Sequence, residues 1–117
     1  MGRLRLLVLV LVLALAATCA TLLAPGSTMA GDAKAGRQKA LQCQTCHGLD
    51  GLSKLPEAPN LAGQNESYLV KALKDYRSGA RKNEMMSIVI ASLKDTDIAD
   101  LAAYYAAIPV TVGTPPK

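Results

Sequence analysis

Hydrophobic and polar residues divide the chain into two parts. Residues 6–24 contain no charged residue and follow Arg3 and Arg5. A basic start, an uncharged apolar run and then a Pro-Gly-Ser break are typical of an export signal. The small residues beyond the break predict cleavage after the thirtieth residue. We therefore expect residues 1–30 to be a signal peptide and residues 31–117 to be the mature domain.

An uncleaved membrane anchor is the alternative for the same segment. The uncharged run approaches the ~20 residues that span a bilayer, and the two arginines would stay on the inner side of the membrane. The break and the small-residue site favour cleavage. In both cases residues 31–117 lie beyond the inner membrane, so we expect a periplasmic protein, with anchoring at the periplasmic side of that membrane as the alternative.

Beyond the leader, hydrophobic positions recur at helical spacing and no alternating run predicts a strand. A first helix is predicted over 33–42, with Asp32 as its N-cap. Three more helices are predicted: 68–76, starting at Asn65 or Ser67 and ending at Gly79; about 85–93, capped by Asn83; and a last one opened by Asp95 or Thr96 and closed by Pro109. The sequence therefore predicts an all-α fold.

The helical pattern is interrupted after the first helix. The interruption contains Gly48, Gly51, Pro56, Pro59 and Gly63, residues that punctuate loops. A loop of this length is uncommon in a compact domain unless it has a functional role. We expect an ordered loop that carries part of a site.

Composition limits what the domain can do. With 117 residues the chain has room for one small domain, which excludes a multidomain enzyme. It has no Trp, no Phe and four Tyr, so another apolar body has to fill the core. The net charge of +4 falls to +2 without the two leader arginines. Since no basic stripe with interleaved aromatic residues is present, we expect no nucleic-acid partner.

The strongest chemical pattern is Cys43-Gln44-Thr45-Cys46-His47, which contains the only His of the chain. Two cysteines three positions apart on a helical turn face the same side. Both thiols can therefore bond to one edge of a haem, and the next residue can reach the iron. This spacing is typical of c-type haem attachment, and a covalent haem would supply the missing apolar body.

Two other interpretations of the cysteine pair are less consistent with the sequence. A thioredoxin-like redox pair belongs with alternating strands and helices, which the pattern does not show. A zinc site needs about four ligands, and no second cluster of Cys or His is available. Haem attachment remains the prediction, with Cys43 and Cys46 forming thioethers and His47 as one axial ligand.

The second axial ligand cannot be a histidine, because the chain has no other. Methionine is the natural donor, and outside the leader only Met85 and Met86 are present. The residues alone leave open which of the two is the ligand. Coordination by His and Met raises the reduction potential relative to two His ligands, which suits an electron carrier.

Several further motifs resemble those of the class I cytochromes c, near the small bacterial periplasmic monohaem type. They comprise Gly36 and residues 43–48, 59–64, 76–79, 81–86 and 97–105. The resemblance covers about residues 31–108. It implies a small cytochrome c-like fold of four to five helices around one covalently attached haem c.

The resemblance also implies roles for individual residues. Met86 matches the axial methionine of the family, which makes Met85 a packing residue. Pro59 matches a loop proline whose carbonyl accepts the proton of the other nitrogen of the iron-bound His, orienting that ring. Gly36 matches the small residue at which the first and last helices cross, packed by Leu101 and Tyr104 or Tyr105.

These observations predict a periplasmic one-electron carrier between respiratory-chain partners rather than an enzyme, because both axial positions of the iron are filled. A cytochrome c subunit of a dehydrogenase or oxidase complex is the alternative. Donor and acceptor are redox proteins that the sequence does not identify. We expect a monomer, and contact with a membrane only if the leader is retained. Clustered charges such as Lys74, Arg77 and Asp95 are expected to form solvated helix faces.

Overall fold

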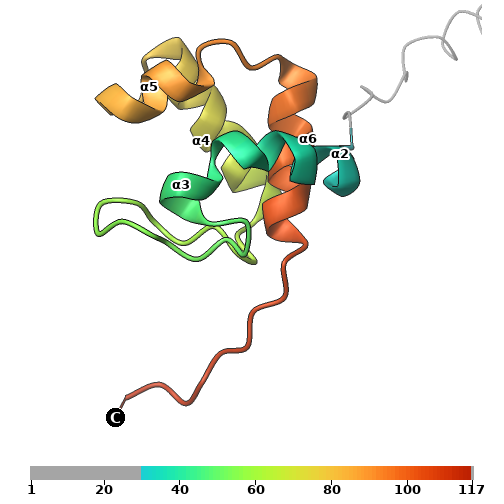
Figure 1. Cartoon of the computed structure of the whole chain (residues 1–117), viewed down its shortest axis with the longest axis vertical. Coiled ribbons are helices and arrows are strands. Elements are labelled where there is room, and N and C mark those ends of the chain that lie inside the picture. The colour runs from blue at the N-terminus through green and yellow to red at the C-terminus, as the bar shows by residue number, and fades with distance from the viewer. Residues whose placement is uncertain (1–29, 117) are drawn as a thin grey trace, which may run out of the picture.

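The computed structural model describes residues 30–116, and the predicted signal peptide lies outside them apart from its last residue. The described part contains α2 (Ala33–Lys39), the 3-10 helix η1 (Ala40–Gln42), α3 (Gln44–His47), α4 (Glu66–Ser78), α5 (Glu84–Ile90) and α6 (Asp95–Ala106) (Figure 1). No strand occurs in these residues, so the predicted all-α fold is confirmed. Among them, no helix has both the length and the apolar character needed to cross a membrane.

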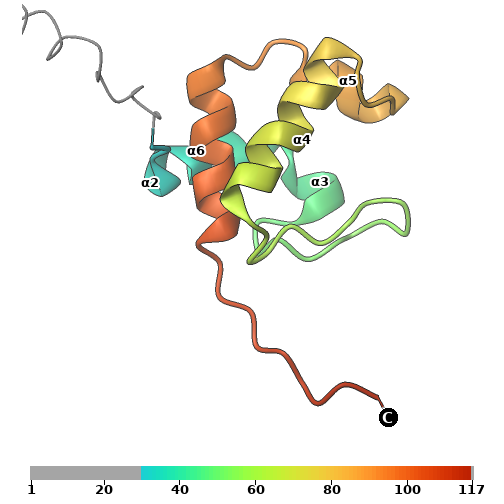
Figure 2. The same cartoon turned by 180° about the vertical axis from the view of Figure 1, so that it is seen from behind.

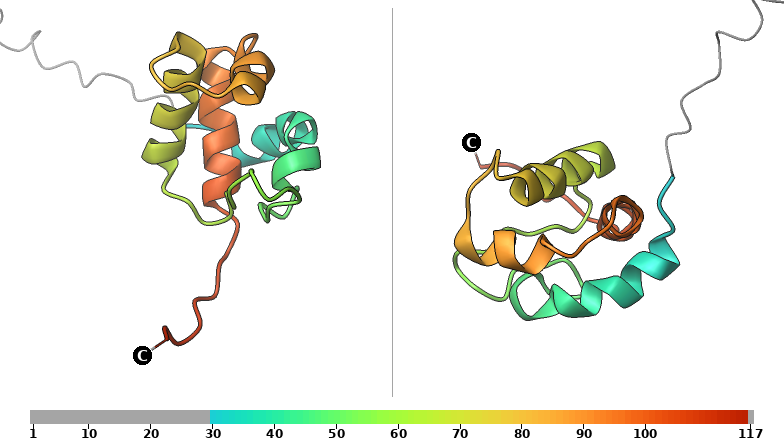
Figure 3. Two further views of the ribbon diagram at one scale, coloured as in Figure 1. Left: turned by 90° about the vertical axis from the view of Figure 1, so that its left-hand side faces the viewer. Right: turned by 90° about the horizontal axis from the view of Figure 1, so that it is seen from above.

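The first predicted helix is not continuous. Asp32 caps α2 as expected, since its Oδ1 accepts hydrogen bonds from the N–H groups of Lys34 (2.8 Å) and Ala35 (3.2 Å). The helix then tightens into η1 around Ala40, which is fully buried. A short helix α3 follows, as the right-hand view of Figure 3 shows. This tightening carries the chain from the α2 contact to the segment that holds the cysteine pair.

Helices α2 and α6 cross at very short range, side by side in Figures 1 and 2. A Cβ atom built on Gly36 would lie only 2.0 Å from the carbonyl oxygen of Asp100 and 2.8 Å from Cβ of Tyr104. Only glycine therefore permits this contact. The predicted crossing of the first and last helices at Gly36 is confirmed.

Ion pairs bridge the helices, which corrects the expectation of simply solvated charged faces. Lys39 Nζ lies 2.8 Å from Asp97 Oδ1 and 2.5 Å from Asp100 Oδ2, joining α2 to α6. Arg77 joins α4 to the start of α6, with Nη2 2.5 Å from Asp95 Oδ1. Each pair connects helices that are distant in sequence, which periodicity within one helix cannot reveal.

The helix ends largely follow the predicted caps. Asn65 Oδ1 accepts from the N–H of Tyr68 at the start of α4, and Gly79 ends that helix in the left-handed conformation (φ 80°). Asn83 caps α5 as predicted. However, α5 ends at Ile90, three positions early, because the chain leaves the helix to bury Leu93 in the core.

The last helix begins at Asp95, as predicted. Its N-cap is Lys94, one position before the predicted opening residues, and the Asp97 carboxylate accepts from the Lys94 N–H (2.9 Å). An acidic group that accepts this hydrogen bond stabilises the first turn. Helix α6 then supplies most of the core, with Ile98, Leu101 and Ala102 almost inaccessible to solvent.

The long loop between α3 and α4 is held against α6 by hydrogen bonds. The hydroxyl of Tyr104 donates to the carbonyl of Leu49 (2.6 Å), and that of Tyr105 donates to the carbonyl of Gly48 (3.3 Å). The N–H of Gly63 donates to the carbonyl of Tyr105 (3.0 Å). The predicted ordered loop is therefore fixed at both ends by the last helix.

Candidate functional site

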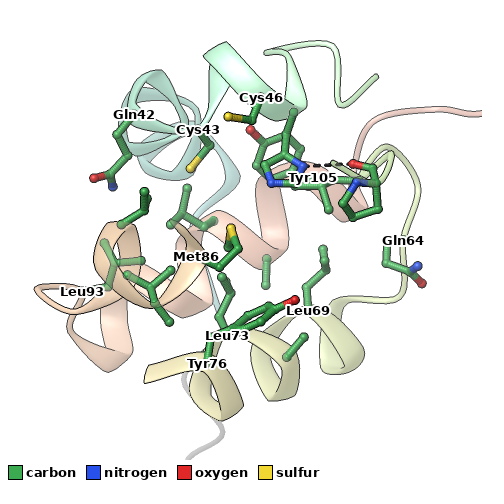
Figure 4. Close-up of a pocket in the computed structure, with 18 of the residues that line it drawn as sticks. Gln42, Cys43, Cys46, Gln64, Leu69, Leu73, Tyr76, Met86, Leu93 and Tyr105 are labelled. Carbon is green, nitrogen blue, oxygen red and sulfur yellow. Dashed lines mark hydrogen bonds between the residues drawn. The ribbon is translucent and has the colours of Figure 1, made fainter. Parts of the chain in front are cut away.

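A cavity of about 200 Å³ lies between the helices and the loop. It is bordered by η1 and α3 on one side and by α4 and α5 on the other, and α6 contributes part of its inner wall (Figure 4). Its apolar walls include Leu69, Leu73, Ile90, Leu93 and Leu101. An apolar cavity with a few polar groups directed into it is the usual form of a cofactor site.

Cys43 and Cys46 both line this cavity and do not form a disulfide with each other. Burial raises the pKa of the Cys43 thiol to about 11. A redox-active pair of the thioredoxin kind needs a lowered pKa, because the thiolate is the reactive form. The environment of Cys43 therefore argues against a thioredoxin-like catalytic thiol.

His47 is buried beside the cysteines, with 7% of its surface exposed. Its Nδ1 lies 2.9 Å from the carbonyl oxygen of Pro59, the dashed line in Figure 4. A carbonyl only accepts hydrogen bonds, so Nδ1 carries the proton and donates it. The lone pair of the ring then belongs to Nε2, and the imidazole is held in the tautomer that a metal ligand requires.

The two methionines have different environments. Met86 packs against the buried core and points into the cavity from α5, opposite the cysteines (Figure 4). Its backbone N–H donates to Asn83 Oδ1 (2.9 Å), which fixes the first turn of the helix. Met85 borders the cavity at its rim but is 61% exposed. Met85 therefore packs at the rim of the cavity rather than in the interior, because its position on the helix turns it outward.

The rim of the cavity also carries Arg81, the only Lys, Arg, Asp or Glu side chain among its lining residues in the described part of the chain. Its guanidinium lies over the ring of Tyr76, 4.7 Å from the centroid. It also donates to the hydroxyl of Tyr68 (3.4 Å). Stacking and hydrogen bonding together hold one positive charge at the edge of an otherwise apolar space.

The sequence did not reveal the role of the two adjacent tyrosines in the site. Tyr104 and Tyr105 were expected only to pack, yet their hydroxyls bind the backbone immediately after His47. Burial raises the pKa of Tyr105, so the hydroxyl stays protonated and donates. The sequence did contain an indication of this role, because Tyr104 and Tyr105 are two of only four Tyr in a chain without Phe or Trp.

Comparison with known proteins agrees with this geometry. The family model described as cytochrome c matches residues 33–107. Cytochrome c4 of Pseudomonas aeruginosa is 48% identical over 84 residues, which cover 72% of this chain and 42% of that protein. Cytochrome c-554(548) of Halomonas halodenitrificans is 48% identical over 79 residues, which cover 65% of this chain and 95% of that protein. The chain belongs to the cytochrome c family.

Solved structures lead to the same class. Reduced cytochrome c4 from Pseudomonas stutzeri superposes with a TM-score of 0.66 and 42% identity, covering 72% of this chain and 49% of that one. The thiosulfate dehydrogenase TsdBA from Marichromatium purpuratum gives 0.62 and 32% identity, covering 66% of this chain and 19% of that one. This chain thus matches only part of these longer proteins. It is a class I c-type cytochrome with the all-α fold.

Haem c attached covalently is the cofactor of this chain, and the observed residues suit it. Two thiols, an imidazole of fixed tautomer and a thioether border one apolar cavity. No group of three or more His, Cys, Asp or Glu able to hold a metal ion occurs among residues 30–116. The donors present are those of a haem site rather than those of a bare metal ion.

Proposed function

We propose that this protein is a one-electron carrier. Cys43 and Cys46 would form the thioether bonds that hold the haem, and His47 and Met86 would ligate its iron. The observation that carries the proposal is the meeting of all four donors at one apolar cavity, from α3, the residue that precedes it, and α5. When bound, the haem supplies an iron that alternates between the ferric and ferrous states.

The chain's own residues tune this iron. The carbonyl of Pro59 holds the His47 ring through Nδ1, which raises the basicity of the coordinating nitrogen. The thioether of Met86 favours the less charged ferrous state and raises the reduction potential. The leucines of the wall exclude water, which further disfavours the extra positive charge of the ferric form.

Arg81 extends the same site to its polar edge. A haem carries two propionate carboxylates, and Arg81 is the one cation among the described residues that line the cavity. A guanidinium binds a carboxylate through paired N–H groups. We assign Arg81 to this contact, with Tyr76 and Tyr68 holding its side chain in place.

A carrier role excludes catalysis at the iron. Peroxidase or oxygen chemistry needs an open coordination position, and His47 and Met86 together would leave none open. The protein would therefore make and break no substrate bond. Its partners are a reduced donor protein that gives up one electron and an oxidised acceptor protein that receives it.

The location proposed for this activity is the periplasm, with residues 1–30 as a cleaved export signal. The basic start and the uncharged run of the leader support export. Attachment as a subunit of a dehydrogenase complex is a second candidate. It is favoured by a thiosulfate dehydrogenase electron acceptor of Stutzerimonas stutzeri that is 41% identical over 71 residues.

One preparation tests these assignments together. The exported protein is purified from a host with haem-attachment machinery, and its intact mass and its visible spectra in both redox states are recorded. We expect the mass of residues 31–117 plus one haem, haem that resists acid-acetone extraction, and a Met-ligated spectrum. Haem in the organic layer would refute covalent attachment, and a mass that includes residues 1–30 would select the anchored form.

A further inference from the structure

Helix α5 is apolar on both of its sides. From Met85 to Ser92 the sequence contains no charged residue. Met86 and Ile90 face the core, whereas Met85 and Ile88 are 61% and 73% exposed. A helix that is hydrophobic all round is normally covered all round. Within residues 30–116 only the inner side is covered.

The exposed residues continue from this helix into the turn that follows it. Met85 and Ile88 are exposed and three positions apart on α5, so they lie on one side of the helix. The exposed residues Ala91 and Ser92 follow in the turn directly after the helix. We call these four residues the outer stripe. Its second half consists of small side chains, which permits the close approach of another helix.

Opposite charges stand at the two ends of the outer stripe. Glu84 precedes it and Lys94 follows it, and both are exposed. Within residues 30–116 neither side chain belongs to any of the six ion pairs. If two copies of the helix pair antiparallel about a two-fold axis, Glu84 of each copy comes to the Lys94 end of the other. The stripe is thus complementary to itself in charge as well as in apolar character.

We propose that the outer stripe is the interface of a homodimer, in which two α5 helices pair antiparallel. This replaces the monomer expected from the sequence. Met85 belongs both to the stripe and to the rim of the cavity, so pairing brings the rims of two cavities to one interface. The proposal rests on the stripe and its flanking charges and does not depend on the electron-carrier function.

The size of the stripe sets the strength of this dimer. The helix contributes two large apolar side chains per copy, and interfaces that bury less than about 1,200 Å² in total are weak and transient. We therefore expect an equilibrium between monomer and dimer that depends on concentration, with a dissociation constant of about 10 µM to 1 mM.

Sedimentation velocity of the haem-loaded protein across that concentration range tests the proposal. We expect the mean mass to rise toward that of a dimer, and Ile88→Asp to weaken association at least ~10-fold, because each interface would bury two unpaired carboxylates. Leu52→Asp is the matched control, since Leu52 is 49% exposed on the loop outside the stripe. A monomer at every concentration, or a dimer unaffected by Ile88→Asp, would overturn the proposal.

A charge exchange tests the antiparallel arrangement. Glu84→Lys and Lys94→Glu should each weaken the dimer, because each creates two like-charge contacts. The double variant should restore most of the association, since the pair is re-formed with its signs reversed. Visible spectra and thermal unfolding confirm that each variant keeps its haem and fold. If the double variant stays as weak as the single ones, the antiparallel pairing is wrong.

Discussion

The crossing of α2 and α6 and the wall formed by α3, α4 and α5 are built on different principles. At the crossing, backbone meets backbone at Gly36, and Lys39 bridges the two helices through Asp97 and Asp100. At the wall, side chains from separate helices face a shared cavity of about 200 Å³. The crossing consists of contacts between protein atoms alone, whereas the side chains of the wall need the haem to fill the cavity between them.

The difference indicates which part of the fold depends on haem. A cavity of this volume left empty in a protein core would cost roughly 5 kcal/mol at ~24 cal/mol per Å³. The whole stability of a small domain is only about 5–15 kcal/mol. We therefore expect the crossing to tolerate loss of haem better than the wall does.

Removal of both thiols should have the largest effect. In Cys43→Ala/Cys46→Ala the haem is no longer attached, and we expect loss of the cooperative unfolding transition, with hydrogen-exchange protection lost in α4 and α5 before α6. Circular dichroism and hydrogen exchange measure this. Thr45→Ala, an exposed position between the cysteines, is the control and should keep the haem. A colourless double variant with a fully protected α4 would show that the wall does not need the haem.

Replacement of the axial methionine should leave the fold but change the iron. Met86→Ala should abolish the weak sulfur-to-iron band in the near infrared of the ferric protein, lower the reduction potential and admit exogenous ligands. Met85→Ala is the matched control. Because Met85 is 61% exposed, it should keep the band and lower the free energy of unfolding by less than about 1 kcal/mol. If the band is lost in Met85→Ala and kept in Met86→Ala, the ligand assignment is wrong by one residue.

A single methyl group added at the helix crossing should lower the free energy of unfolding by a moderate amount. Gly36→Ala places a Cβ 2.0 Å from the Asp100 carbonyl oxygen. Overpacking of this kind costs about 1–3 kcal/mol, against which the helix propensity of Ala returns less than ~1 kcal/mol. Gly113→Ala, where no atom lies within 4 Å, should change stability by less than about 0.5 kcal/mol. Denaturant unfolding compares the two, and equal stabilities would contradict the close crossing.

The smallest effect is expected from the ion pairs of the crossing. Lys39 lowers the pKa of the Asp100 carboxyl and of the Asp97 carboxyl below their ordinary value of 3.8. Since the folded pKa values are lower than the unfolded ones, the stabilisation is present above about pH 4 and is lost as pH falls through the folded values. Asp100→Asn should therefore flatten the acid side of a plot of melting temperature against pH.

The control for this measurement is Glu57→Gln on the exposed loop, where the carboxylate belongs to no ion pair within the described residues. It should leave the acid side of the curve unchanged. An identical curve for Asp100→Asn and the original protein would mean that solvent screens the Lys39 pairs completely, as it does for many exposed pairs.

Local chemistry in the sequence predicted several elements correctly. Asp32, Asn65 and Asn83 cap helices where expected, and Gly79 ends α4, because a cap depends on one side chain and the nearest backbone. The cysteine and histidine spacing identified the cofactor for the same reason. Its chemistry is contained in five consecutive residues.

Only the tertiary structure shows which residues that are distant in the sequence contact one another. Periodicity did not show that α5 stops early to bury Leu93, nor that Arg77 of α4 bonds the carbonyl of Leu93 and the carboxylate of Asp95. It also did not show that Met85 points outward, or that the hydroxyls of Tyr104 and Tyr105 bind the backbone after His47. Each depends on how one helix is rotated and placed against another. That placement is set by the packing of the whole core around the haem cavity, which no local stretch of sequence contains.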